Sequence, residues 1–293
     1  MEVKRIAAVN DLSGFGRCSL TVSIPILSAM GFQVCPLPTA VLSAHTGYPN
    51  PVVRDFTADM EGFLNHWESL GLTFACGYTG YLGNERQADV LEPFLHHLRE
   101  QGALRLVDPA MADNGKLYSS CSPALVQAMA RLVALATVAT PNLTEACLLT
   151  GASYDTVMAM QDRRHAVEEM ARRIVAGGCG AVVITGVEAG EIIENCVLSS
   201  VDADPMWVGG HRVDRHFAGT GDLFASVLCG WLLRKVDLVQ AVEKTTDFVC
   251  RTTAHTAEMD TNGQDGIAFE PFLRDSCTRR NSSILRTGQE EMC

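Results

Sequence analysis

The chain has 293 residues, of which 47% are hydrophobic and 19% charged, and its formal net charge is −11. This composition allows a large buried core and excludes disorder over most of the length. The negative charge disfavours nucleic acid or an anionic membrane as the main partner.

The sequence predicts neither an export signal nor a metal cluster. Residues 1–5 lead directly into an apolar run, without the long hydrophobic segment of a signal peptide. No stretch of about 18 uncharged apolar residues predicts a membrane span. The eleven cysteines are scattered without a C-x-x-C pair, which argues against a zinc cluster or a thioredoxin motif. We therefore expect a soluble, cytoplasmic protein with no nucleic-acid or membrane partner.

Short apolar runs alternate with longer segments of helical period, which is typical of βαβ units around a mainly parallel sheet. In the first part of the chain we expect strands over 6–9, 32–37, 74–78 and 103–107, and helices over 19–30, 56–70 and 85–100. Pro25 lies inside the first of these helices and predicts a kink or a later start.

The same alternation continues in the second part. We expect helices over 123–135, 158–176, 223–233 and 238–257, strands over 136–139 and 181–185, and two antiparallel strands over 192–198 and 206–208. From Arg274 onward the periodicity fades into Ser, Thr, Arg and Glu. With no internal repeat or linker, the sequence predicts one domain over 1–273 and a disordered tail over 274–293.

A first glycine-rich segment runs from Gly14 to Ser19 and follows the first predicted strand. It resembles a dinucleotide-binding fingerprint, but Ser19 replaces the third glycine. The second predicted strand ends in Pro-Leu-Pro-Thr, without the acidic residue that the fingerprint expects. These departures disfavour a dinucleotide site, and the lack of a G-x-x-x-x-G-K-[ST] motif argues against a Walker-type NTPase.

A second glycine-rich segment, Gly219-Thr220-Gly221-Asp222, opens the predicted helix 223–233. Its glycines let backbone N–H groups turn toward one point before a helix N-terminus, which forms an anion hole for a transferred phosphoryl group. Asp222 begins the helix close to that hole, where a carboxylate can accept the proton of an attacking hydroxyl. Taken alone, the segment fits equally well an ordinary turn in which Asp222 caps the helix.

Four segments together resemble the ribokinase-like superfamily and, within it, the pyridoxal kinase branch. They are PLPTAVLSAHT over 36–46 with TGYLG over 79–83, DPAM over 108–111, TPNLTE over 140–145 followed by LTG over 149–151, and GTGD over 219–222. The resemblance covers almost the whole chain except the tail, and the four motifs in order are more specific than any one alone. It implies a three-layer α/β/α sandwich with a mainly parallel central sheet.

The resemblance also implies an activity and a set of site residues. The expected enzyme is a homodimeric kinase that uses ATP and Mg²⁺, with K⁺ as a further candidate, to phosphorylate the 5′-hydroxymethyl group of pyridoxamine, pyridoxal or pyridoxine. Asp222 is the expected base, with the anion hole at Gly219, Thr220 and Gly221. The vitamer is expected at Asp11, Thr39, Ser43, His45, Thr46 and Tyr81. The nucleotide is expected at Asn142, Thr185, Gly186, Gly219 and Gly221, and the metal at Asp108 and Glu145.

Physical arguments support several of these roles. Asn142 and Glu145 are three residues apart at a helix start, so both can face one site. Glu145 suits water-mediated contact with Mg²⁺, which usually keeps several waters. Asp108 ends a parallel strand, where ligand sites of α/β sheets open. The alternatives are a carboxylate that favours the helix dipole for Glu145 and an ordinary Asp-Pro turn for Asp108.

The sequence departs from the family pattern at Asp11, where many pyridoxal kinases carry serine. A carboxylate there can pair with a cationic ring nitrogen or amine and disfavours an anionic phenolate, which favours pyridoxamine or pyridoxine over pyridoxal. Alternatively, the side chain stays in solvent. Cys121 lies where some relatives use a lid cysteine, but we expect a structural role because the base is Asp222. Lys116 is either a phosphate ligand or a solvated loop residue.

Three other functions compete with this interpretation. A hydroxymethylpyrimidine kinase of thiamin synthesis shares the same motifs. A sugar kinase fits the segments 36–46 and 80–83 less well. A non-catalytic vitamin-binding protein belongs to a different class, and intact Asp222 and Glu145 argue against it.

Overall fold

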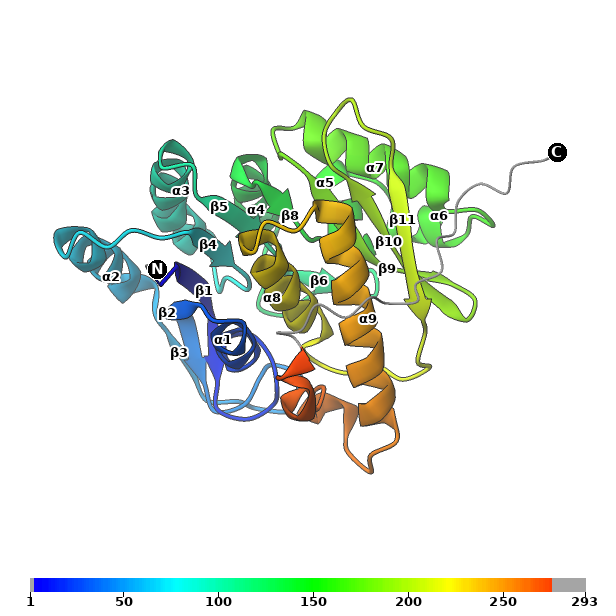
Figure 1. Ribbon diagram of the computed structural model, residues 1–293, viewed down its shortest axis with the longest axis horizontal. Coiled ribbons are helices and arrows are strands. Elements are labelled where there is room, and N and C mark those ends of the chain that lie inside the picture. The colour runs from blue at the N-terminus through cyan, green and yellow to red at the C-terminus, as the bar shows by residue number, and fades with distance from the viewer. Residues whose placement is uncertain (1–2, 276–293) are drawn as a thin grey trace.

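A nine-stranded sheet forms the centre of the computed structural model, which describes residues 3–275 (Figure 1). The strand order is β11-β10-β9-β8-β5-β4-β1-β2-β3. The strands are β1 (Arg5–Ser13), β2 (Gln33–Leu42), β3 (Val53–Asp55), β4 (Cys76–Thr79), β5 (Leu104–Val107), β8 (Val138–Ala139), β9 (Val182–Ala189), β10 (Ile192–Leu198) and β11 (Met206–His211). Every pair from β2 to β9 is parallel, and β3, β10 and β11 join antiparallel at the two edges.

Helices cover both faces of this sheet (Figure 1). One face carries α2 (Thr57–Ser69), α3 (Glu85–Glu100), α4 (Pro123–Leu135), α5 (Leu143–Thr150), α6 (Tyr154–Met158) and α7 (Arg164–Ala176). The other carries α1 (Leu20–Ala29), α8 (Thr220–Leu233) and α9 (Leu238–Ala257). In β1, Ala7 and Val9 belong to the first core and Ile6 to the second, as the two-residue period of a strand buried on both faces requires. The predicted α/β/α sandwich is therefore confirmed.

Several predicted boundaries differ from the structure. The helix expected over 158–176 begins only at Arg164, because the Asp162 carboxylate accepts a hydrogen bond from the Arg164 N–H and starts a new helix there. The strand expected to end before Gly186 continues to Ala189, because β10 folds back and pairs with it. Pro25 does not delay α1, which begins at Leu20 and buries its apolar face against the sheet and α8.

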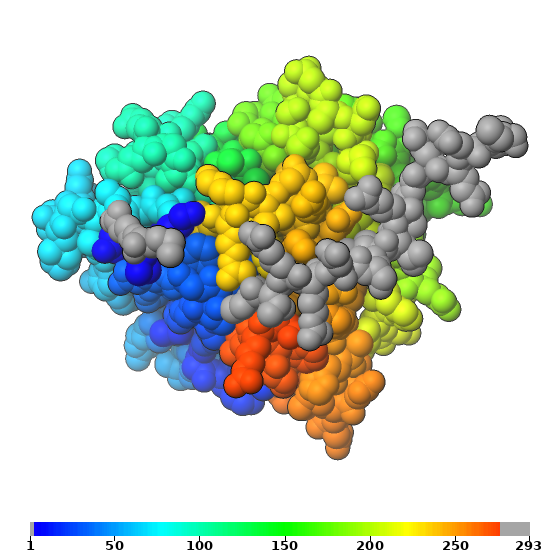
Figure 2. Space-filling view, viewed as in Figure 1, coloured from blue at the N-terminus to red at the C-terminus, as the bar shows by residue number. Residues whose placement is uncertain are grey.

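The C-terminal part of the described chain lies against the N-terminal part. The short helix η1 (Gly263–Asp265) follows α9, and the Asp265 carbonyl accepts a hydrogen bond of 3.0 Å from the Arg17 N–H. In Figure 2 the segment that follows (red) lies between the N-terminal region (blue) and α9 (orange). The predicted tail over 274–293 lies outside the described residues, except for its first two positions.

No helix within residues 3–275 combines the length and the apolar character that crossing a membrane requires.

Candidate active site

Four carboxylates from distant parts of the chain gather where the parallel strands end. Asp11 belongs to β1, Asp108 follows β5, Glu145 lies in the first turn of α5, and Asp222 lies in the first turn of α8. Asp11, Asp108 and Glu145 are 6%, 6% and 3% exposed, and Asp222 is partly buried. The ligand edge expected for an α/β sheet is therefore the edge at which these acids meet.

Asp222 is not the cap of its helix. Helix α8 begins at Thr220 rather than after Asp222, and its N-cap is Gly219, with φ of 74°. The Asp222 carboxylate instead accepts a hydrogen bond of 3.1 Å from the side-chain amide of Asn10 in β1. The alternative in which Asp222 is an ordinary helix cap is therefore wrong, and its carboxylate lies beside the glycine turn.

The first glycine-rich segment, from Gly14 to Ser19, packs against the second, from Gly219 to Asp222. A Cβ atom on Gly219 would lie 2.0 Å from the carbonyl oxygen of Arg17, so this backbone-to-backbone contact requires glycine. The neighbouring Gly16, with φ of 90°, leaves room for the ring of His45, which a Cβ would approach to 2.3 Å. The segment from Gly14 to Ser19 thus packs directly against the turn that opens α8.

Burial and mutual repulsion raise the pKa of the acids in this site. Burial raises the pKa of Asp222 to about 6, the charge of Asp11 adds to the rise, and hydrogen bonds from the Ser19 amide and from Asn10 oppose it. The pKa of Asp108 rises to about 8, first through burial and then through Asp222. Burial, followed by the charge of Asp108, holds the pKa of Glu145 well above its usual range.

No ion pair within the described residues compensates this excess of negative charge. Among residues 3–275, none of the four carboxylates forms an ion pair with Lys, Arg or His. Burying unpaired carboxylates is costly, so a bound cation would stabilise the site. The arrangement therefore favours a ligand that brings positive charge.

Asn142 and Glu145 form a reciprocal capping box at the start of α5. Glu145 Oε2 accepts from the Asn142 N–H at 2.8 Å, and Glu145 Oε1 accepts from the Met111 N–H at 3.1 Å. The Asn142 side chain accepts from the Glu145 N–H at 2.9 Å and donates to the Ala112 carbonyl at 2.8 Å. Both side chains therefore hold the loop after β5 against α5, which places Glu145 next to Asp108.

Three of the five predicted nucleotide residues lie side by side. Thr185 forms a bridge with Asn142 across parallel backbone segments, and its N–H donates to the Pro141 carbonyl at 2.9 Å. Gly186 is exposed, with φ of 73°, and its N–H donates to the Asn195 side chain at 3.3 Å. The structure thus brings Asn142, Thr185 and Gly186 together at one edge of the site.

The predicted vitamer residues differ in burial and in hydrogen-bond partners. Thr39 is fully buried, and its hydroxyl donates to the Tyr81 carbonyl at 3.0 Å, so it supports the backbone that carries Tyr81. The Tyr81 ring is half-buried, with Ser120 and Cys121 near its hydroxyl. Asp11 is buried and accepts from the Ser13 hydroxyl at 2.9 Å, which contradicts a solvent position for its side chain.

His45, Ser43 and Thr46 belong to the loop after β2. His45 Nδ1 accepts from the Gly47 N–H at 3.1 Å, and Nε2 lies 2.7 Å from the Gln264 carbonyl. These partners assign the proton to Nε2 and join the loop to η1. Ser43 Oγ accepts from the Val52 N–H at 2.9 Å, and Thr46 is exposed. Only Thr46 of these three lacks a structural hydrogen bond within the described residues.

Sequence reasoning missed Asn10 and a small hairpin beside the site. The hairpin pairs β6 (Ala112–Asp113) with β7 (Lys116–Leu117) through Asn114 and Gly115, both with positive φ. Asn-Gly is the strongest short hairpin signal, so this element was predictable.

Lys116 belongs to this hairpin, and Cys121 follows it in the chain. Lys116 is exposed in β7. Cys121 is partly buried, and burial raises its pKa to about 11, which keeps it a thiol, as a structural role requires.

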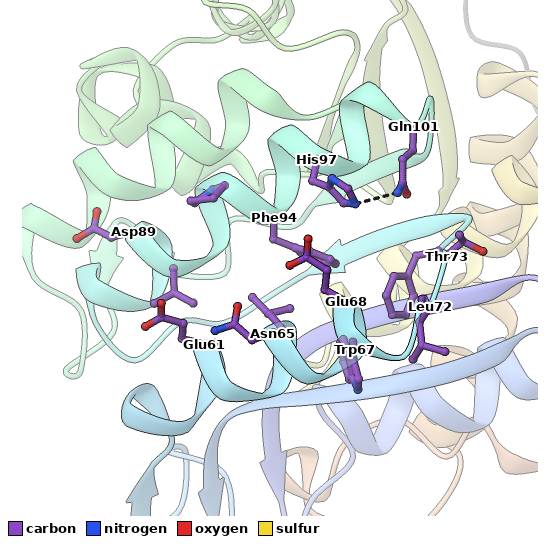
Figure 3. A pocket seen from close by; sticks show the side chains of 15 residues that line it. Glu61, Asn65, Trp67, Glu68, Leu72, Thr73, Asp89, Phe94, His97 and Gln101 are labelled. Carbon is purple, nitrogen blue, oxygen red and sulfur yellow. Dashed lines mark hydrogen bonds between the residues drawn. The ribbon is translucent and has the colours of Figure 1, made fainter.

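A separate groove of about 670 Å³ lies between α2 and α3 (Figure 3). Trp67, Phe74 and Phe94 line its apolar part, and Glu61, Glu68 and Asp89 line its acidic part. None of the predicted site residues lines this groove, so it is not part of the candidate active site.

Comparisons with known proteins identify a kinase family over most of the chain. The family model described as phosphomethylpyrimidine kinase matches residues 71–266. A pyridoxine/pyridoxal/pyridoxamine kinase of Bordetella avium is 32% identical over 264 residues, which cover 87% of this chain and 86% of the relative.

Solved structures agree with these sequence relatives. A Bacteroides thetaiotaomicron protein, named as a phosphomethylpyrimidine kinase and crystallised with pyridoxal, is 36% identical, with a TM-score of 0.90 over 97% of this chain and 100% of that chain. The pyridoxal kinase of Lactobacillus plantarum is 30% identical, with a TM-score of 0.84 over 94% and 97% of the two chains. The chain therefore belongs to the pyridoxal kinase family of ribokinase-like proteins.

Proposed function

We propose that this protein transfers the γ-phosphoryl group of ATP to the 5′-hydroxymethyl group of a vitamin B6 vitamer, with Asp222 as the base. The observation that carries the proposal is the Asp222 carboxylate, held by Asn10 in the first turn of α8 beside the Gly219 turn. Pyridoxine, pyridoxal and pyridoxamine are the substrates named for the Bordetella relative.

In this proposal each part of the site has a role that its position supports. Asp222 takes the proton of the hydroxymethyl group. The oxygen of that group bonds to the γ-phosphorus of ATP while the bond from the γ-phosphorus to ADP breaks. The first N–H groups of a helix have no partner inside it, so those at the start of α8 can bind the phosphoryl oxygens. Asn142, Thr185 and Gly186 are the proposed nucleotide edge. Tyr81 and Asp11 are proposed to contact the vitamer, with Thr46 at the loop after β2.

The decisive experiment is ADP release with Mg-ATP and pyridoxamine, pyridoxal, pyridoxine or hydroxymethylpyrimidine offered separately. Turnover on a B6 vitamer supports the proposal. Because Asp11 is buried and favours a cationic partner, we expect pyridoxamine or pyridoxine to exceed pyridoxal. No turnover on any vitamer overturns the vitamin assignment.

Hydroxymethylpyrimidine kinase activity is the second candidate, because the matching family model is described as phosphomethylpyrimidine kinase. Turnover on hydroxymethylpyrimidine alone would favour this candidate with the same base and the same phosphate turn. The two activities differ only in the ring that the pocket accepts.

Asp108 and Glu145 fit the requirements of Mg²⁺. They are neighbouring buried carboxylates, and Mg²⁺ commonly takes one or two carboxylates and keeps several waters. Of the two carboxylate oxygens of Asp108, only Oδ1 has a hydrogen-bond partner in the described chain. It accepts from the Thr140 hydroxyl at 3.2 Å. Bound Mg²⁺ would neutralise charge on the ATP phosphates, and these two residues would hold it directly or through water.

Removing Mg²⁺ is expected to abolish turnover. We expect EDTA to stop ADP release and excess Mg²⁺ to restore it. Asp108→Asn should raise the Mg²⁺ concentration needed for half-maximal rate by about tenfold or more. Titration of ADP release with Mg²⁺ measures this, and an unchanged requirement in Asp108→Asn would remove Asp108 from the metal site. The same assay in K⁺ and in Na⁺ tests the proposed monovalent cation.

The acid limb of the pH profile should report Asp222. Its pKa is raised from the usual value to about 6, so the base is protonated and inactive below that pH and ionised above it. We therefore expect kcat/KM to fall as the pH drops through about 6 and to level off above it. Measuring the pH profile with two vitamers distinguishes an ionisation of the enzyme from an ionisation of the substrate. Only an ionisation of the enzyme gives the same pKa in both profiles.

We further propose a homodimer in the cytoplasm. Val53 begins the edge strand β3 and is 46% exposed, and its neighbours Val52 and Val41 of β2 are 57% and 37% exposed. A second copy would cover these valines and the unpaired edge of β3. Sedimentation velocity tests the dimer against the 31.6 kDa of one chain. The free thiols of the described cysteines favour a reducing compartment.

A further inference from the structure

The side chain of Asn10 links three parts of the active site. Its Oδ1 accepts from the Asp11 N–H at 3.0 Å and from the Tyr81 N–H at 2.9 Å. Its Nδ2 donates to Asp222 Oδ1 at 3.1 Å. Asn10 is 2% exposed, so these bonds form away from competing water. One amide thus joins β1, the segment after β4 and the start of α8.

The orientation of this amide is determined by its partners. Two backbone N–H donors face the oxygen, so a flipped amide would place its NH₂ group against both of them and its oxygen against the Asp222 carboxylate. Gly80 makes room for the amide in this orientation, because a Cβ there would lie 2.3 Å from Asn10 Nδ2. The donor aimed at Asp222 is therefore built into the fold.

A second donor to Asp222 comes from a strained residue. The Ser19 backbone amide lowers the pKa of the same carboxylate, as a hydrogen-bond donor does. Ser19 has φ of 50° and ψ of −128°, a left-handed conformation that disfavours any residue with a Cβ. Strained backbone of this kind is concentrated at functional sites. Asp222 is thus held between donors from β1 and from the entry to α1.

We propose that Asn10 is a positioning residue for phosphoryl transfer, because its amide fixes the Asp222 carboxylate and couples it to the backbone that carries Tyr81. This inference rests on the proposed role of Asp222 as base. Asn10 itself does not take the proton. It holds the base at one position relative to the vitamer pocket, so that the base and the hydroxymethyl group meet in the reactive geometry.

The test uses Asn10→Asp, which has nearly the same shape. Aspartate keeps an acceptor for the Asp11 and Tyr81 N–H groups, but it replaces the donor to Asp222 with a like charge. We expect kcat to fall about 10²-fold, while KM for the vitamer and for ATP stays within about threefold. If Asn10 served only the backbone bonds, Asn10→Asp would keep wild-type kcat, and that result would overturn the inference.

A double-variant cycle separates this inference from the proposed function. If Asn10 acts through Asp222, adding Asn10→Asp to Asp222→Asn lowers kcat by no more than about threefold further. Losses that multiply in the double variant overturn the positioning role and leave Asp222 as base. If Asp222→Asn alone keeps wild-type turnover, the base assignment fails, and the inference fails with it.

Asn84→Asp is the matched control. Asn84 also donates to an aspartate, Asp55, at 3.1 Å and accepts from two backbone N–H groups, those of Arg86 and Gln87, at 3.1 and 3.3 Å. It caps α3 and is not one of the proposed site residues. We expect the kcat of the Asn84→Asp variant to stay within about threefold of the wild-type value. Thermal unfolding of all variants confirms that the losses do not arise from unfolded protein.

Discussion

Replacing Asp222 with asparagine is expected to lower kcat by about 10²- to 10⁴-fold while the chain remains folded. Asparagine has the same shape and can still accept the hydrogen bond from Asn10, but it cannot take the proton of the hydroxymethyl group. ADP release at saturating vitamer and Mg-ATP measures the loss. The KM values should change much less than kcat, because the proton transfer occurs in the transition state.

The same substitution should not destabilise the protein. Burial raises the pKa of Asp222 to about 6, so the folded state holds a proton that the unfolded chain releases at lower pH. Above pH 6 the folded state carries an unfavourable buried charge, and asparagine removes it. We therefore expect Tm of Asp222→Asn at pH 8 to equal or exceed that of the wild type.

Asp237→Asn provides the control for Asp222→Asn. Asp237 is the N-cap of α9, where asparagine caps equally well, so turnover and Tm should both be unchanged. Near-normal turnover of Asp222→Asn would contradict the base assignment. A loss of similar size in Asp237→Asn would show that the assay responds to something other than the base.

Gly219→Ala is the second substitution with a large expected effect. Its Cβ would lie 2.0 Å from the Arg17 carbonyl oxygen, in a backbone with φ of 74°, so the turn must move. Because this turn opens the anion site at α8, we expect kcat to fall about 10²- to 10³-fold, as for the loss of one transition-state donor. ADP release measures the loss, and Tm should fall as well.

Gly102→Ala separates backbone strain from the loss of the anion turn. Gly102 also has positive φ, 68°, but nothing lies within 4 Å of its Cβ position, and it is outside the site. We expect a modest fall in Tm with unchanged kcat. Wild-type kcat in Gly219→Ala would mean that the turn does not bind the transferred phosphoryl group.

Local pattern predicted much of the fold. The boundaries of α3, α4 and α9 agree with the sequence prediction, because their apolar periodicity is regular and their caps are clear. Weaker features were missed. Strand β3 has three exposed residues and pairs only with β2, and the start of α7 depends on the hydrogen bond that Asp162 accepts from the Arg164 N–H. These features depend on a few specific hydrogen bonds, and the apolar periodicity of the sequence does not predict such bonds.

The sequence by itself determined the family, the sheet architecture and the motif residues from Asp108 to Asp222, because each motif is a short run whose chemistry depends on neighbours along the chain. Only the tertiary structure decided how they work together. Asn10 and Asp222 are 212 positions apart, and Gly219 requires glycine because of the Arg17 carbonyl. These contacts form because the ends of parallel strands and the starts of helices meet at one edge of the sheet. Their partners are far apart in the sequence, so no local sequence pattern predicts them.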